Sequence, residues 1–115
     1  MNTITIEELM KQKPETITVL DVRPADEYRR GTFDGAISMP MKEIPERKEE
    51  IPKDKPVYLL CHTGERSMEY VDYLEQNGYD AWNVEGGYRA YLRMQLASFV
   101  QEEDARKEKT AEIER

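Results

Sequence analysis

The 115-residue chain lacks the groups by which many small proteins are cross-linked or bind metals. It contains one cysteine and one histidine, so it cannot form an intrachain disulfide, and these two residues cannot complete a zinc site with four protein ligands. No apolar run approaches the roughly 20 residues that cross a bilayer, and residues 1–10 carry Glu7 and Glu8 instead of the basic and apolar blocks of a signal peptide. We therefore expect no metal, no membrane contact and a cytoplasmic location, where a lone thiol stays reduced and reactive.

Positive charge is also in short supply. Against 24 acidic residues the chain has 17 lysines and arginines, which gives a formal net charge of −7, so nucleic-acid phosphates would on average be repelled. The length fits one domain, and 38% hydrophobic residues supply one core. Beyond Gln101 the apolar stripe of the last predicted helix nearly vanishes. We expect a domain over residues 1–100 and a charged extension over residues 101–115, either helical or frayed.

Short apolar runs alternate with helical patterns along the chain. Strands are predicted at 17–20, 57–60 and 81–84, with shorter ones near the N-terminus and at 35–40. Helices are predicted after Thr5, which has capping-box spacing with Glu8, and at 25–30, 68–77 and from Tyr88 onward. Residues 42–50 suit a surface helix or an irregular crossover, anchored by Ile44 and Ile51. This order predicts an α/β domain with a mainly parallel central sheet flanked by helices on both faces.

Cys61 directly follows the predicted strand at 57–60, and ligands in such folds bind beyond the carboxyl ends of the strands. The segment that joins it to the next helix is Cys61-His62-Thr63-Gly64-Glu65-Arg66-Ser67. Backbone N–H groups that curl around the sulfur, with a helix N-terminus behind them, would stabilise a nucleophilic thiolate. A lone cysteine is more often a small buried apolar residue, but Gly64, Arg66 and Ser67 favour a reactive role.

The spacing from Cys61 to Arg66 is C-x4-R, one residue shorter than the C-x5-R loop with which cysteine phosphatases bind phosphate. A shorter loop suits a smaller anionic group, such as the terminal sulfur of a persulfide. The shorter loop also argues against phosphatase or arsenate chemistry.

Three motifs, taken in order, resemble the rhodanese-like family from about residue 5 to residue 94. They are Asp21-Val22-Arg23 with Glu27-Tyr28 and Gly31, then Gly35-Ala36 leading to Pro40, then Cys61-x-x-Gly64-x-Arg66-Ser67 followed by Val84-x-Gly86-Gly87. The resemblance implies a three-layer α/β domain and a thiosulfate sulfurtransferase that needs no cofactor. Such an enzyme takes a sulfane sulfur from thiosulfate or a similar donor, holds it as a Cys61 persulfide and passes it to a thiophilic acceptor, cyanide in vitro. The alternative is a sulfur carrier or partner-binding module that another protein loads by persulfide exchange.

Some residues near Cys61 have two candidate roles. Arg66 would orient an anionic donor, or would stabilise the loop by pairing with Asp21 or Glu27. Asp21, Arg23 and Glu27 would support the site. For Asp21 and Arg23 the alternative is a helix cap and a surface ion pair. Thr32 stands where the family often has a histidine after the glycine.

The loop itself and the last helix carry the remaining expectations. His62 is expected to face solvent, although it could act as a base beside the nucleophile. Glu65 would weaken thiosulfate binding and slightly favours the carrier alternative. We expect a monomer, with a dimer through the C-terminal helix as the alternative, because Phe99 and Val100 extend its apolar stripe.

Overall fold

Five parallel strands form one sheet in the order β1-β5-β4-β2-β3. The computed structural model describes the backbone of residues 2–114 and the side chains of residues 2–101 and 103. The strands are β1 (Thr3–Ile4), β2 (Thr18–Asp21), β3 (Ile37–Ser38), β4 (Val57–Leu60) and β5 (Ala81–Val84). The predicted α/β class is thereby confirmed, with the brief N-terminal strand at one edge of the sheet.

The central strands β2 and β4 are buried along their whole length. Their register pairs Asp21 with Leu60, so both strands end at the same edge of the sheet, and Cys61 follows there. Side chains alternate between two apolar clusters, with Leu20 and Leu59 on one face and Val19 and Leu60 on the other. A sheet with two apolar faces requires cover on both.

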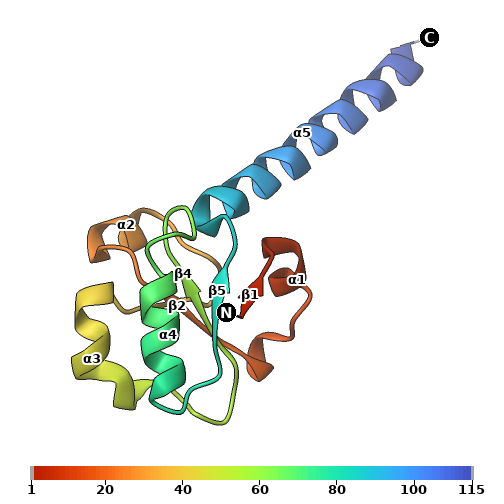
Figure 1. Ribbon diagram of the computed structural model, residues 1–115. Coiled ribbons are helices and arrows are strands. Elements are labelled where there is room, and N and C mark those ends of the chain that lie inside the picture. The colour runs from red at the N-terminus through yellow and green to blue at the C-terminus, as the bar shows by residue number, and fades with distance from the viewer. Residues whose placement is uncertain (1, 115) are drawn as a thin grey trace.

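Helices cover both faces of the sheet, so the domain has three layers (Figure 1). The helices are α1 (Ile6–Met10), α2 (Ala25–Arg30), α3 (Ile44–Arg47), α4 (Met68–Gln76) and α5 (Gly87–Glu114), with single 3-10 turns at Pro14–Thr16, Met41–Glu43 and Lys48–Glu50. Val71 and Leu74 of α4 pack with Ile44 of α3 on one face, while α1 and the start of α5 pack on the other. The crossover at 41–51 is anchored by buried Ile44 and Ile51, as predicted.

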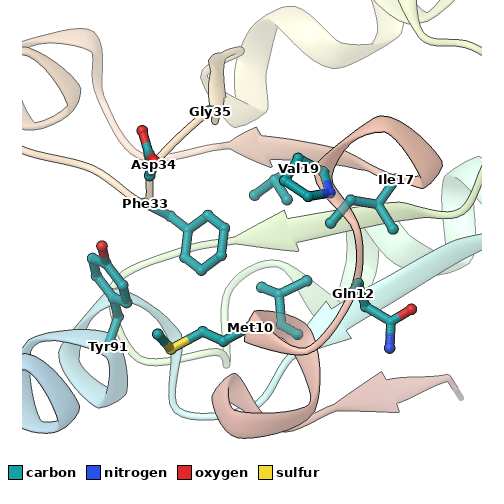
Figure 2. Close-up of a pocket in the computed structure, with 10 residues that line it drawn as sticks. Met10, Gln12, Ile17, Val19, Phe33, Asp34, Gly35 and Tyr91 are labelled. Atoms are coloured by element: carbon teal, nitrogen blue, oxygen red, sulfur yellow. The ribbon is translucent and has the colours of Figure 1, made fainter.

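The start of α1 has the predicted cap, because the Thr5 side chain accepts the backbone N–H of Glu8 at 3.2 Å. Ile6, Leu9 and Met10 are the apolar residues of this helix, and their spacing predicts that all three lie on its buried side. Ile6 and Leu9 are buried, whereas Met10 is 48% exposed, so this prediction is wrong for Met10. The helix ends at Met10 after five residues. Figure 2 shows Met10 beside a pocket of about 310 Å³ that β2 and Phe33 help to line.

α5 leaves the domain as a single projecting helix (Figure 1), and the molecule is 64 Å long on its longest axis. Tyr91 packs in the core and Met94 lies partly against it, whereas every side chain from Gln95 to Gln101 is exposed. The predicted long terminal helix is confirmed. Side chains beyond Gln101, apart from Glu103, lie outside the described residues, so the division into a domain of 1–100 and an extension of 101–115 stays a prediction. Within residues 2–114, no helix combines the length and apolar character needed to cross a membrane.

Candidate active site

Cys61 lies at the carboxyl end of β4 with its side chain 1% exposed. Its Sγ accepts the backbone N–H of Gly64 at 2.9 Å and lies 3.3 Å from the Ser67 hydroxyl oxygen. The thiol borders a cavity of about 700 Å³ between the loop, the start of α2 and the segment after β3. The residues that line this cavity are Val22, Arg23, Pro24, Glu27, Pro40, Met41, Lys42, Glu43, Cys61, His62, Thr63, Glu65 and Arg66.

Gly64 gives the loop its tight curve around the sulfur. Its φ is +87°, and a Cβ at this position would lie 2.7 Å from the carbonyl oxygen of Val84, so no larger residue fits without moving β5. The predicted ring of N–H donors is formed at one position, since the Gly64 N–H is the only backbone N–H that donates to Sγ among the described residues. Within the described residues, the backbone N–H groups of Thr63 and Arg66 in the loop have no protein acceptor.

The first turn of α5 holds the loop from the other side. The Tyr88 N–H donates to the carbonyl of Cys61 at 2.8 Å, and the Arg89 N–H donates to that of His62 at 3.1 Å. These are two of the donors that a helix N-terminus leaves unpaired. Gly87 permits the close approach, because a Cβ there would lie 2.3 Å from the Cys61 carbonyl oxygen. Two successive glycines after a strand predict a tight strand-to-helix turn. Gly86 and Gly87 form this turn, both with positive φ, and it also positions the loop.

Asn83 is a site residue that the sequence did not identify. It lies in β5, is 1% exposed, and its Nδ2 donates to the carbonyl of Gly64 at 2.8 Å. Its Oδ1 accepts the Ser67 hydroxyl. The available signal was a single polar residue within the otherwise apolar strand at 81–84, because a buried amide is stable only when it is hydrogen-bonded.

Asp21 and Arg23 form a buried ion pair beside the cavity, with side chains 0% and 5% exposed. Arg23 Nη2 lies 2.7 Å from Asp21 Oδ2 and also donates to the carbonyl of Gly31 at 2.7 Å, while the Thr32 hydroxyl donates to Asp21 at 2.7 Å. The predicted helix cap and surface ion pair are therefore wrong, and Pro24 precedes α2 instead. Sequence spacing did not reveal that residues 31–32 fold over the end of β2.

The guanidinium of Arg23 also lies over the Tyr88 ring, 3.9 Å from its centroid, which connects β2 to α5. Burial by itself would lower the pKa of Arg23, but the hydrogen bond and the negative charge of Asp21 outweigh burial and raise it. The arginine therefore stays charged, and its charge is matched inside the protein.

The remaining predicted residues lie around the opening of the cavity. His62 is exposed, as expected, Thr63 and Glu27 are half-buried, and Glu65 and Arg66 are exposed. Arg66 has no ion pair with Asp21 or Glu27 within the described residues, so the loop-closing role proposed for it is wrong. Asp21 is already bound to Arg23. The other role, that of orienting an anionic donor, stays a prediction.

The structure places the single thiol at the carboxyl edge of a parallel sheet in an α/β domain, at the start of the loop Cys61 to Arg66 that carries the resemblance. The chain belongs to the rhodanese-like domain family, because it matches the family model for the rhodanese-like domain over residues 5–94. The three-layer rhodanese-like fold predicted from the motifs is confirmed.

Known relatives extend this assignment. The chain is 38% identical over 96 residues to a sulfurtransferase of Allochromatium vinosum, covering 81% of this chain and 90% of that one. It is 31% identical over 75 residues to a putative sulfur carrier protein of Bacillus subtilis, covering 63% of this chain and 40% of that one. The crystal structure of a rhodanese-like domain protein from Staphylococcus aureus is 39% identical with a TM-score of 0.73, covering 79% and 91% of the two chains. These relatives support sulfur transfer as the activity.

Proposed function

We propose that the protein is a sulfurtransferase that carries a sulfane sulfur on Cys61 as a persulfide. The observation that carries this proposal is the placement of Sγ, which accepts the Gly64 N–H at 2.9 Å at the edge of a cavity of about 700 Å³. Donors aimed at a sulfur stabilise its anionic form, and the thiolate is the nucleophile. The family and its relatives named as sulfurtransferases support the same chemistry.

The proposed reaction has two displacements at sulfur. The Cys61 thiolate attacks the outer sulfur of thiosulfate, an S–S bond forms to Sγ, and the S–S bond of thiosulfate breaks as sulfite leaves with the electron pair. A thiophilic acceptor such as cyanide then attacks the outer sulfur of the persulfide, which regenerates the thiolate. The sulfur moves without an external oxidant or reductant, and the kinetics are ping-pong.

Arg66 and the loop amides are the groups proposed to receive an anionic donor. Arg66 is exposed at the cavity, and its N–H and that of Thr63 have no acceptor within the described residues. Lys42 adds a second positive charge across the cavity. Donors that combine N–H groups with a cation bind anions well. A reducing cytoplasm would keep Cys61 as a thiol between turnovers.

Intact mass spectrometry tests the proposal directly. After incubation with thiosulfate, the wild-type protein is expected to gain one sulfur atom, and cyanide is expected to remove it as thiocyanate. Cys61→Ser keeps the size of the side chain and is expected to gain none, because its hydroxyl is not a nucleophile at neutral pH. Sulfur on the serine variant, or no sulfur on the wild type with any persulfide donor, would contradict the assignment.

A sulfur carrier loaded by another protein is the second candidate, and Glu65 is the observation that favours it. This carboxylate is exposed in the loop and lines the cavity, so it repels a small dianion such as thiosulfate. A carrier is expected to gain one sulfur from a protein or organic persulfide while thiosulfate leaves its mass unchanged. Glu65→Gln is then expected to permit loading by thiosulfate, whereas an unchanged mass in that variant would show that Glu65 does not exclude the donor.

A further inference from the structure

Four residues form a closed ring of hydrogen bonds on the buried side of the loop. The Gly64 N–H donates to Cys61 Sγ at 2.9 Å, and the Gly64 carbonyl accepts Asn83 Nδ2–H at 2.8 Å. Asn83 Oδ1 accepts the Ser67 hydroxyl, whose oxygen lies 3.3 Å from the same Sγ. All four residues are buried. The ring therefore connects the sulfur to β5 through two separate donors.

Asn83 fixes both of these donors through one planar amide. Its Nδ2 is bound to the Gly64 carbonyl, so its Oδ1 must face Ser67. A hydroxyl has one hydrogen, and Ser67 has two acceptors within reach, Sγ and Asn83 Oδ1. An apolar residue at this position of β5 would pack in the sheet without a buried amide that needs hydrogen-bond partners. The position of Asn83 is therefore accounted for by the loop and not by the sheet.

We propose that Asn83 is a positioning residue for the sulfur chemistry of Cys61, acting through Gly64 and Ser67. The proposal rests on the role given above to Cys61. Among the described residues, Asn83 makes hydrogen bonds to Ser67 and Gly64 but none to Sγ, and it does not line the cavity. We therefore expect its effect on the sulfur to pass through these two partners.

The hydrogen bonds of the ring are also expected to change as the negative charge moves between the two sulfur atoms during transfer. While Cys61 is a thiolate, the Ser67 hydroxyl and the Gly64 N–H both donate to Sγ. When the persulfide forms, the negative charge moves to the outer sulfur, and the Ser67 hydroxyl donates to Asn83 Oδ1 instead. No covalent bond to carbon or sulfur changes in this rotation. In the thiolate state Asn83 Oδ1 gives up the Ser67 hydrogen to the charged sulfur, and in the persulfide state it regains that hydrogen.

Asn83→Asp is the sharpest variant, because it changes one donor to an acceptor at constant size. A carboxylate cannot donate to the Gly64 carbonyl, it draws the Ser67 hydroxyl away from sulfur, and it adds a second negative charge near the thiolate. We expect the midpoint of the pH profile of Cys61 alkylation by iodoacetamide to rise by about one pH unit. At a pH below both midpoints, this corresponds to about tenfold slower alkylation.

The charged groups that share the cavity with Cys61 are unchanged in this comparison. They are His62, Glu65 and Arg66 in the loop, Arg23 after β2, Glu27 in α2, and Lys42 and Glu43 after β3. Asn77→Asp is the matched control, because Asn77 Nδ2 donates to the carbonyl of Tyr73 at 2.8 Å at the far end of α4. It makes the same chemical change away from the sulfur and is expected to leave the midpoint unmoved.

Ser67→Ala provides the second arm and is expected to raise the midpoint as well. Because Asn83 acts partly through Ser67, the double variant is expected to shift less than the sum of the two single variants. An Asn83→Asp protein that folds by circular dichroism and keeps the wild-type profile overturns the proposal, as do strictly additive shifts. If Asn83→Asp does not fold, an unchanged profile in Ser67→Ala overturns it. Alkylation needs only the thiol, so this outcome is separate from a failure to load sulfur.

Discussion

The ion pair of Asp21 and Arg23 shows how residues can support the site without a hydrogen bond to the sulfur. Its two side chains are buried, and each has a further hydrogen-bond partner. Arg23 donates to the carbonyl of Gly31, and Asp21 accepts the hydroxyl of Thr32. Buried charges are tolerated only under such conditions. The pair fixes the end of β2, and the residues that follow it, Val22, Arg23 and Pro24, line one side of the Cys61 cavity.

Removing the charge of Asp21 is expected to destabilise the fold. In Asp21→Asn the guanidinium of Arg23 stays buried without a counter-charge, which is expected to cost about 3 kcal/mol in the free energy of unfolding. Urea denaturation followed by circular dichroism measures this loss. Asp26→Asn is the control, because Asp26 pairs with Arg30 at 2.7 Å on an exposed helix face, where an ion pair adds little. Equal effects of the two variants would contradict the role given to the buried pair.

Local sequence was enough to predict where Cys61 and Gly64 lie, since a residue that follows a buried strand and a glycine in a tight loop depend on near neighbours. The partners of Arg23 and Asn83 were not predictable in the same way. Asn83 reaches the loop because β4 and β5 pair in parallel with Leu59 opposite Asn83, a register that the spacing of the two runs does not encode. The two candidate roles of Arg66 could not be separated for the same reason, because the sequence does not show that Asp21 pairs with Arg23.

At the scale of elements, the junction between β5 and α5 holds the loop through the hydrogen bonds of Tyr88 and Arg89 to Cys61 and His62. Gly87→Ala is expected to displace the loop, because the new Cβ would lie 2.3 Å from the carbonyl oxygen of Cys61. We expect a lower rate of sulfur loading and a stability loss well above the roughly 1 kcal/mol of a left-handed alanine. Loading is measured by intact mass, and stability by urea denaturation.

Gly35→Ala is the matched control for that junction. Its φ of +85° imposes a comparable backbone strain, but a Cβ there would meet no atom within 4 Å. The variant is expected to lose about 1 kcal/mol and to load sulfur at the wild-type rate. If Gly35→Ala and Gly87→Ala behave alike, backbone strain alone explains both, and the contact between α5 and the loop has no functional weight.

The elements themselves were predicted where their patterns were strong. The apolar runs that became β2, β4 and β5 fix the sheet, and the spacing of Val71 and Leu74 predicts α4. β3 is only Ile37–Ser38, shorter than the run at 35–40, because it pairs with β2 alone at the edge of the sheet. Short apolar segments give little periodicity, so their limits depend on which neighbour is present.

For the whole molecule, the projecting part of α5 is separate from the packed domain. Side chains from Gln95 to Gln101 are exposed, so a chain ending at Gln101 is expected to keep the urea midpoint and the sulfur loading of the full chain. Analytical ultracentrifugation of the full chain is expected to give a monomer of 13.5 kDa. A dimer that dissociates on truncation would show instead that Leu96 and Phe99, both exposed, form an interface.

The two hydrogen bonds from α5 to the loop make the start of the helix a reporter on the site. The amide hydrogens of Tyr88 and Arg89 are shielded only while they bind the carbonyls of Cys61 and His62. Their exchange with deuterium therefore measures how often the loop opens. Loading Cys61 with sulfur, or changing Asn83, would thus be recorded as altered isotope uptake in a helix that carries no catalytic group.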